Sequence, residues 1–296
     1  QLKEISMQNI DNALLELIKQ TSCLLPDDVL SSINNAYNNE TENTPAKFAL
    51  ADVIENVKLA NEKSTPICQD TGTNYFIVNY PAHMEKSTLE QKIIQSVKKA
   101  CELNYLRPNS VNPLTNKNTG DNTGKGHPAV DFILWDNDYL EIKLMLKGGG
   151  CENMGRQYSL PDESIGAGRD INGVKKCILD SVYQAQGFGC APGILGVCIG
   201  GDRADSLKHA KKQLFRKIGS RNPDKALSEI ETWSLDKANT LKIGPMGYGG
   251  NVTVLDVFVD YLNRIPASFF VSISYMCWAC RRKTLKYFSG GRFEIE

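Results

Sequence analysis

A change in hydrophobic spacing near Pro66 constrains the fold more than any other feature of the chain. From Ile5 to about Ala60 the apolar residues recur at helical spacing, with one face carrying Leu14, Leu15, Leu17 and Ile18. Pro66 ends this helical segment, and short apolar runs of strand type then alternate with helical stretches. Helices followed by strands mixed with helices predict a protein of mixed α and β class, α/β to α+β, with mixed sheets. No clear linker is visible, so we expect one compact unit that can consist of two lobes.

The positions of the individual elements follow from the same patterns. A second helix is expected after Pro26, capped by Asp27 or Asp28, and a third from Pro45, after the polar loop Asn38–Thr44. Strands are expected at 75–78, 130–135, 140–146, 194–199, 252–261 and 267–275, and helices at 89–103, 174–186, 205–218 and 224–234. The turn at 136–138 predicts that strands 130–135 and 140–146 form a hairpin.

The charge balance excludes several classes of function. The 296 residues contain 34 Lys and Arg against 34 Asp and Glu, which argues against nucleic acid or an anionic membrane as the main partner. No apolar run approaches the roughly 18 residues that a transmembrane helix needs. The N-terminal segment is amphipathic and mixed in charge, unlike a secretory signal. We therefore expect a cytoplasmic protein.

Four glycine-rich loops can present backbone N–H groups to an anion; they lie at 70–73, 118–124, 147–150 and 244–251. Each could equally be a tight turn between strands. None matches a Walker A loop or a dinucleotide-binding GxGxxG motif, so nucleotide binding is not supported. Four such loops in a chain of balanced charge suggest a small anionic ligand held largely by backbone groups.

The nine cysteines are too many for one role and odd in number. In a reducing compartment most of them should be buried thiols. Cys68 and Cys190 instead lie in glycine turns, and Cys277 follows an apolar run. Cys277 and Cys280 form a CxxC pair, which could be half of a zinc site or a redox dithiol. No second close pair exists and the three histidines are isolated, so a zinc site is weakly supported.

Six motifs in a fixed order carry a resemblance to a known family: Pro66-Ile-Cys-Gln-Asp-Thr-Gly, Asn118-Thr-Gly-Asp-Asn-Thr, Lys147-Gly-Gly-Gly, Gly189-Cys-Ala-Pro-Gly-Ile with Gly200-Gly, Gly244-Pro-Met-Gly-Tyr-Gly-Gly and Cys277-Trp-Ala. Together they resemble the α subunit of class I, iron–sulfur-dependent fumarate hydratase and L(+)-tartrate dehydratase. The likeness runs from about Ile54 to Arg282, which is most of the chain. It implies a cluster-binding domain over residues 1–285, followed by a short tail at 286–296.

The resemblance also implies a cofactor and a set of site residues. One [4Fe–4S] cluster would be held by Cys68, Cys190 and Cys277. Three thiolates leave one iron with an open position, which can act as a Lewis acid on a 2-hydroxy acid. Asp70 would serve in acid–base chemistry, although it could also be an Asx-turn residue. The substrate carboxylates would be bound by Gln69, Arg107 and the backbone of Gly149 and Gly150.

The implied activity is that of a hydro-lyase, most simply the reversible hydration of fumarate to L-malate. L(+)-tartrate dehydratase, or a hydratase of another C4–C5 diacid, is the alternative within the same class. The alternative from another class is a non-catalytic metal or redox protein that uses Cys277 and Cys280. It leaves Cys68 and Cys190 and their loops unexplained.

The chain departs from the family pattern at several positions. Many relatives carry a histidine twelve residues before the third cluster cysteine, where this chain has Ile265. The loop Thr123–Pro128 is longer than the usual pattern. Cys151, Cys198 and Cys280 are not family ligands, and Cys280 is the main challenger to Cys277 for a ligand role.

The resemblance further implies a partner. The family's C-terminal swivelling domain has no counterpart here, and in this family that domain or a separate β subunit supplies the catalytic base and further cationic groups. We therefore expect a hetero-oligomer that contains a β subunit and acts on a small dicarboxylate.

Overall fold

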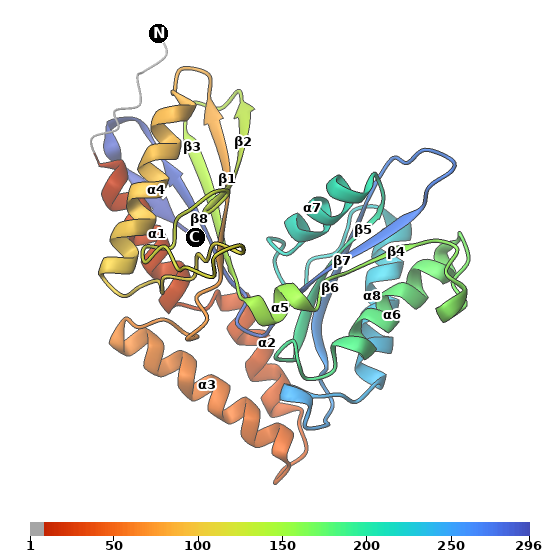
Figure 1. The fold of residues 1–296 in the computed structure, drawn as a ribbon. Coiled ribbons are helices and arrows are strands. Elements are labelled where there is room, and N and C mark those ends of the chain that lie inside the picture. The colour runs from red at the N-terminus through yellow and green to blue at the C-terminus, as the bar shows by residue number, and fades with distance from the viewer. Residues whose placement is uncertain (1–8) are drawn as a thin grey trace. The chain divides into compact units, whose positions relative to one another are not determined.

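The computed structural model describes residues 9–296, and the expected start of the first helix at Ile5 lies outside them. The chain divides into two compact units (Figure 1). Unit 1 contains the described residues up to Pro26, Asn56–Gly149 and Cys280–Glu296; unit 2 contains Asp27–Glu55 and Gly150–Ala279. Helices and mixed sheets occur in both, so the predicted mixed α and β class is confirmed.

Unit 1 is built on a five-stranded sheet in the order β2-β1-β3-β8-β9. Its strands are β1 (Thr73–Pro81), β2 (Ala129–Trp135), β3 (Leu140–Lys147), β8 (Arg281–Tyr287) and β9 (Phe293–Ile295). Strand β2 runs parallel to β1, and the other neighbours are antiparallel. Strands from the first half of the chain and strands from its C-terminal end therefore share one sheet.

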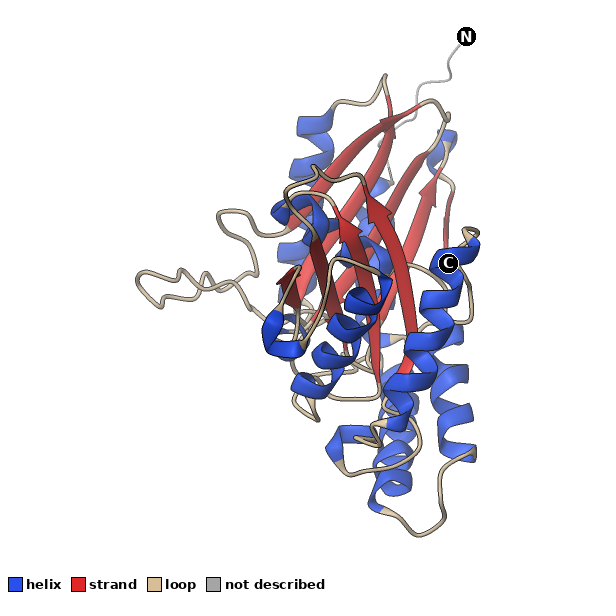
Figure 2. Ribbon diagram, turned by 90° about the vertical axis from the view of Figure 1, so that its right-hand side faces the viewer, coloured by secondary structure: helices blue, strands red, loops and turns tan. Residues whose placement is uncertain are grey.

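Helices α1 (Ile10–Cys23) and α4 (Lys86–Glu102) lie side by side against this sheet (Figure 1). Figure 2 distinguishes the helices from the strands in a view turned by 90°. The predicted apolar face of α1 is buried at Leu14, Leu17 and Ile18, while Leu15 is only partly buried. These side chains pack on alternate residues of the strands, such as Phe76, which point to one face of the sheet. The core of unit 1 lies between these two helices and the sheet.

The predicted hairpin between strands 130–135 and 140–146 is wrong. Both strands exist, but β1 lies between them and pairs with each. Strand β1 is buried at five consecutive positions, as expected of a central strand, whereas β2 exposes Ile133 and Leu134. The short turn at 136–139 therefore passes across β1 instead of joining paired neighbours.

Unit 2 contains a four-stranded sheet in the order β4-β7-β5-β6. Its strands are β4 (Arg156–Ser159), β5 (Gly193–Gly200), β6 (Val254–Leu262) and β7 (Phe270–Met276). Strands β5 and β6 are parallel, and β7 is antiparallel to β4 and β5. The continuous apolar run of β5 is almost fully buried, as a strand in the middle of a covered sheet requires.

Three long helices cover the two faces of this sheet. Helix α7 (Arg203–Gln213) packs on β5, β7 and β6, while α6 (Ile171–Ala185) and α8 (Lys225–Thr240) lie together on the other face (Figure 1). Unit 2 also contains α2 (Asp27–Asn38), the beginning of α3 (Pro45–Lys63), most of α5 (Gly149–Asn153) and the short helical turns Glu163–Ile165 and Pro245–Gly247.

Several element boundaries differ from the predicted ones. The basic helix predicted at 205–218 ends at Gln213, and the helix predicted at 224–234 continues to Thr240. Asp27 and Asp28 form the first turn of α2 instead of preceding it. Strands β4, β8 and β9 and helix α5 were not predicted.

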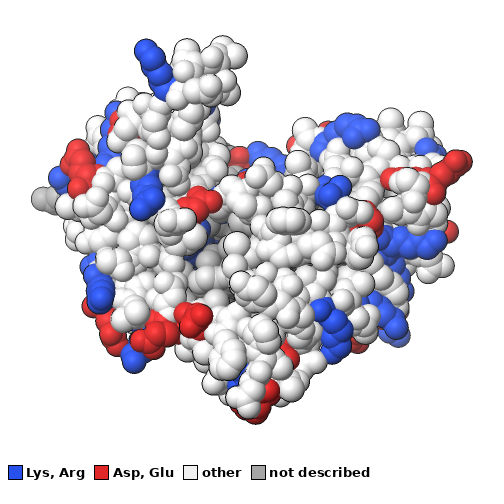
Figure 3. Space-filling view, turned by 60° about the horizontal axis from the view of Figure 1, so that its bottom comes forward, with Lys and Arg blue, Asp and Glu red and all other residues white. Residues whose placement is uncertain are grey.

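The balanced composition is visible on the surface, where the face drawn in Figure 3 carries basic and acidic side chains interspersed. Between residues 9 and 296, no helix combines the length and the apolar character needed to cross a membrane.

Candidate functional site

In unit 1 the loop that carries Cys68, Gln69 and Asp70 joins the end of α3 to β1. Two hydrogen bonds to the Ile67 backbone fix it just before the cysteine. The Ile67 N–H donates to the Ser22 carbonyl at 3.0 Å, and the side-chain amide of Asn56 donates to the Ile67 carbonyl at 2.8 Å. Ile67 is buried, whereas Cys68 is partly accessible and Gln69 is exposed. The apolar anchor at Ile67 thus presents the two polar residues that follow it.

The carboxylate of Asp70 joins two of the glycine loops. Its Oδ1 accepts the Gly72 N–H at 2.9 Å, and its Oδ2 accepts the Gly149 N–H at 2.7 Å. Asp70 therefore does form an Asx turn, and it also fixes the backbone of the Lys147–Gly149 loop. Gly72 has φ +74°, and a Cβ there would lie 2.5 Å from the Lys147 backbone, so only glycine fits this close approach.

Arg107 lies beside the same loop. Its backbone N–H and the side chain of Asn109 both donate to the hydroxyl of the buried Thr71, at 3.0 and 3.1 Å. These bonds fix the backbone of Arg107, while its side chain is exposed. Unit 1 therefore brings together the predicted residues Cys68, Gln69, Asp70, Arg107 and Gly149.

In unit 2, Cys190 lies in the turn between α6 and β5. It has φ +53°, and its N–H donates to the Gly187 carbonyl at 3.0 Å. The ring of Tyr275 packs so closely on this turn that a Cβ at Gly189 would lie 2.4 Å from it. The glycine next to Cys190 is thus required by close packing, and the turn holds the thiol partly accessible.

Cys277 lies next to this turn, directly after β7. The N–H of its neighbour Trp278 donates to the Cys190 carbonyl at 3.3 Å. Burial raises the pKa of Tyr275 far above its usual value, and the nearby Cys277, Cys151 and Cys190 raise it further. Unit 2 therefore brings the predicted ligands Cys190 and Cys277 together around one buried tyrosine. Gly150, the remaining predicted backbone group, is also exposed in this unit.

The glycine loop 244–251 packs against the Cys190 turn and is hydrogen-bonded to it. The Met246 N–H donates to the Ala191 carbonyl at 2.9 Å, and a Cβ at Gly187 would lie 2.5 Å from the Met246 carbonyl oxygen. This loop therefore has a structural role in unit 2.

The three predicted cluster cysteines differ from most of the others in accessibility. Cys68, Cys190 and Cys277 are partly exposed, and so is Cys101; the buried cysteines are Cys23, Cys151, Cys177, Cys198 and Cys280. Burial raises the pKa of four of the remaining thiols, to about 11 for Cys23, Cys101 and Cys198 and to about 12 for Cys177. These four are held as neutral thiols, which are poor metal ligands. Cys280 is 1% exposed and so differs from the three predicted ligands, which are partly accessible.

The described side chains that could bind a metal do not form a site for a single ion. Among residues 9–296, no group of three or more His, Cys, Asp or Glu side chains is arranged to hold a single metal ion. An iron–sulfur cluster makes a different demand, because each of its cysteines binds a different iron atom. The partly accessible thiols of Cys68, Cys190 and Cys277, which lie in loops next to strands, fit such a group.

Two of the departures from the family pattern have a clear structural setting. Ile265 lies in the loop after β6 and is 68% exposed. Its neighbour Arg264 donates to the carbonyls of Ile265, Pro266 and Ser268. In the lengthened loop, Gly124 and His127 exchange backbone hydrogen bonds, and burial lowers the pKa of His127. This loop is an ordered turn with a neutral histidine.

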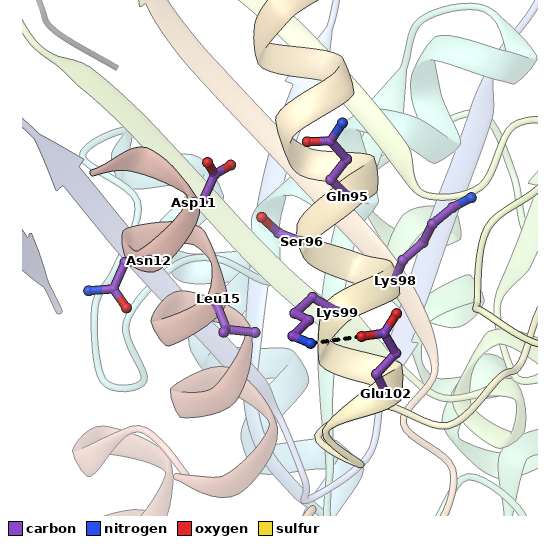
Figure 4. A pocket seen from close by; sticks show the side chains of 8 residues that line it. All are labelled: Asp11, Asn12, Leu15, Gln95, Ser96, Lys98, Lys99 and Glu102. Atoms are coloured by element: carbon purple, nitrogen blue, oxygen red, sulfur yellow. Dashed lines mark hydrogen bonds and ion pairs between the residues drawn. The ribbon is translucent and has the colours of Figure 1, made fainter. Parts of the chain in front are cut away.

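A separate cavity of about 480 Å³ lies between α1 and α4 (Figure 4). Its charged groups are paired within the protein: Lys99 with Glu102, Lys98 with Asp121 and Asp11 with Lys92. None of the predicted site residues lines it. The cavity therefore offers no unpaired charge to an anionic ligand.

Two residues that the sequence did not single out contact the predicted site residues. Tyr275 packs on the Cys190 turn, and the guanidinium of Arg281 donates to the Asp70 carbonyl at 2.9 Å. The only signal for Arg281 was its position directly after the CxxC pair.

Comparison with known proteins shows a consistent set of relatives. Residues 11–286 match the family model described as fumarate hydratase (Fumerase). The chain is 47% identical over 279 residues to a protein of Geobacillus stearothermophilus that carries the name fumarate hydratase class I, spanning 93% of this chain but only 54% of that protein. It is 37% identical to a protein of Methanocaldococcus jannaschii that carries the name L(+)-tartrate dehydratase subunit alpha, over 92% of this chain and 95% of the relative. It is 32% identical to the L(+)-tartrate dehydratase subunit alpha of Escherichia coli K12, over 99% and 97%.

Proposed function

Because the chain belongs to the fumarate hydratase (Fumerase) family, we propose that it is the α subunit of a [4Fe–4S]-dependent hydro-lyase. Its reaction is the reversible hydration of fumarate to L-malate, carried out with a separate β subunit. The observation that carries this proposal is the Asp70 carboxylate, bound between two glycine loops and two residues from Cys68.

Cys68, Cys190 and Cys277 are the proposed ligands of the cluster. When bound, the cluster supplies a Lewis-acid iron for the hydroxyl of the substrate. The accessibility of these three thiols supports the assignment, as does the pairing of Cys190 with Cys277 around Tyr275. Cys280 is left as a buried thiol.

Asp70 is the proposed acid–base group near the substrate hydroxyl. Each of its oxygens accepts one backbone N–H, which fixes the carboxylate and leaves further lone pairs for a proton of the substrate or of water. Such a fixed carboxylate needs little reorganisation during proton transfer.

The exposed side chains of Gln69 and Arg107 are proposed to bind a substrate carboxylate, the arginine through its planar fork. Exposed backbone at Gly149 and Gly150 is proposed as the second carboxylate site, since neither glycine carries a side chain that would block an anion. The Gly149 N–H donates to Asp70, so the N–H of Gly150 would be the donor to the anion. A dicarboxylate would thus be held at both ends.

A β subunit is proposed as the partner, carrying a swivelling domain and the catalytic base. Two of the relatives carry the name subunit alpha and are matched over 95% and 97% of their length, which supports a heteromeric assembly. Within this chain, residues 1–285 are proposed as the cluster-binding domain. Residues 286–296, the proposed tail, include the end of β8 and strand β9, which belong to the sheet of unit 1.

The direct test is anaerobic co-expression of the chain with a β subunit, followed by iron and sulfide analysis and a fumarate hydration assay. The proposal requires a cluster together with hydration activity. A well-folded complex that binds iron and sulfide but hydrates no C4–C5 diacid would refute the assigned reaction.

Ile265 favours a second candidate substrate, L(+)-tartrate or another C4–C5 diacid. Many relatives carry a histidine at this position, whereas the exposed isoleucine offers no hydrogen bond to a substrate. Names of the M. jannaschii and E. coli relatives refer to L(+)-tartrate. Comparing kcat/KM for fumarate, malate, tartrate and mesaconate distinguishes the two, because the physiological substrate should have the highest value.

A further inference from the structure

The guanidinium of Arg281, at the start of β8, is buried beside the Asp70 loop. The side chain is the largest among the fully buried ones of the described residues, and the residue is 1% exposed. Its Nη2–H donates to the Asp70 carbonyl at 2.9 Å, across 211 positions of sequence. Between residues 9 and 296, its Nε–H and Nη1–H find no acceptor. Within the described part of the chain, no carboxylate forms an ion pair with it.

This arrangement is costly for folding. A buried cation loses its hydration, and an ion pair or a full set of hydrogen bonds normally offsets the loss. Arg281 has one hydrogen bond to a neutral carbonyl. A residue kept only for packing at this position would be expected to be apolar, as its cross-strand neighbour Leu146 is.

The sheet register places a second unpaired polar group in the same row. Leu146 of β3 pairs with Arg281 on one side and with Asn74 of β1 on the other, so the three side chains point to one face. Asn74 is completely buried, and neither of its side-chain polar atoms has a partner among the described residues. The polar character of this end of the sheet therefore extends from β8 to β1, directly where the Asp70 loop enters β1.

From these contacts we infer that Arg281 is a positioning residue for the Cys68–Gly72 loop, retained at a cost to stability. This inference rests on the proposed function, since it assigns the loop to the reacting site. The carboxylate of Asp70 is fixed by the Gly72 and Gly149 N–H groups, and its main chain is fixed by Arg281. Without the arginine, the loop would still be held at Ile67 and Thr71, but the main chain of Asp70 would lose its bond to β8.

Three variants test the inference in the full-length chain: Arg281→Met, Arg281→Lys and the control Lys283→Met. Methionine keeps much of the volume but removes the donor and the charge, whereas lysine keeps one donor and the charge. Lys283 lies two residues further along β8 on the same face and faces Leu144 across the strands.

Hydrogen exchange and thermal unfolding give readouts that are independent of activity. In Arg281→Met, the amides of Gly72 and Gly149 should exchange at least about tenfold faster, while the melting temperature should equal or exceed that of the wild type. Arg281→Lys should restore much of the protection, and Lys283→Met should leave it unchanged. Unchanged exchange at both glycines, or a clear fall of the melting temperature in Arg281→Met, would overturn the inference.

Kinetics with the β subunit complete the test. We expect Arg281→Met to lower kcat about 10- to 100-fold with iron content retained. KM should change less than kcat, because Gln69 lies in the loop that Arg281 holds, whereas the backbone of Arg107 is held by Thr71. A kcat equal to that of the wild type would also overturn the inference. If the wild-type complex hydrates no diacid, the proposed function fails, and the exchange and melting data still decide whether Arg281 positions the loop.

Discussion

At the scale of single residues, Asp70 shows how a turn residue becomes a candidate reacting group. Its Oδ1 closes an Asx turn, which a short polar side chain before a glycine does in many proteins. Its Oδ2 reaches a second loop 79 positions away, and this long-range bond distinguishes it from an ordinary turn. The partly buried Asp162 forms a similar local turn with Ser164 and thus provides a matched comparison.

Replacing Asp70 by asparagine should lower activity far more than stability. The amide can still accept the Gly72 N–H, but its NH₂ group then faces the N–H of Gly149, and the proton-transfer group is lost. We expect kcat to fall at least about 100-fold and the free energy of unfolding to fall by about 1–2 kcal/mol. Steady-state kinetics and urea unfolding measure the two effects, with Asp162→Asn as the control that keeps full activity. Equal activity in both variants would remove Asp70 from the reaction.

The buried thiol of Cys177 should make the protein less stable at alkaline pH. Burial raises its pKa from 9.0 to about 12 in the folded state, so the unfolded state loses the proton first as pH rises. The stabilisation is therefore fully present below pH 9 and is lost progressively between pH 9 and about 12. Urea midpoints between pH 7.5 and 10.5 should fall more steeply for the wild type than for Cys177→Ala. Parallel pH profiles would contradict the assignment of this loss to Cys177.

At the scale of elements, the sequence predicts the strands better than their pairing. The apolar run at β1 and the continuous run at β5 identify central strands, because such runs need burial on both faces. Pairing depends on contacts distant in sequence, so a short turn wrongly indicated a hairpin between β2 and β3. Strand β8 was missed because its sequence, RRKTLKY, is dominated by charged residues instead of the alternating apolar residues of a half-buried strand. Its buried Arg281 contacts the Asp70 loop.

For the candidate site, the sequence motifs identified the loops. The roles of Tyr275 and Arg281 depend on contacts between residues distant in sequence, which no motif shows.

A buried carboxylate joins three elements of unit 2. Glu231 of α8 is completely buried; its Oε1 accepts the Val259 N–H at 2.8 Å and an Arg216 N–H at 2.6 Å, and its Oε2 accepts the Asn222 N–H at 2.9 Å. Glu231→Ala leaves these donors without the carboxylate, and we expect it to cost about 3 kcal/mol. Chemical unfolding should show this loss, while the exposed Glu229→Ala should change stability by less than about 0.5 kcal/mol. A loss below 1 kcal/mol for Glu231→Ala would show that the network contributes little.

At the scale of the whole molecule, the chain is evenly charged, whereas its proposed substrate is a dianion. Its 34 basic and 34 acidic residues give no net charge, yet a dicarboxylate needs several cations around it. Among the proposed site residues, Arg107 is the single one with a cationic side chain. The proposed β subunit would supply the remaining positive charge and the catalytic base.

The chain should therefore depend on its partner for turnover. Purified anaerobically without a β subunit, it should bind iron and sulfide but hydrate fumarate at least about 100-fold more slowly than the complex, because the base is proposed to lie on the β subunit. Adding the β subunit should restore the rate in proportion to complex formation. Full activity of the isolated chain would show that it contains the whole reacting site.

The most direct test of the central claim is the iron and sulfide content of cysteine variants. Each of Cys68→Ser, Cys190→Ser and Cys277→Ser, reconstituted anaerobically, should lose the cluster and its visible absorption, since each removes one of three thiolate ligands. Cys280→Ser and Cys101→Ser should keep both, and circular dichroism should show that all five variants are folded. We therefore expect three variants without a cluster and two with one. Retention of a full cluster in any of the first three, or its loss in Cys280→Ser, would contradict it.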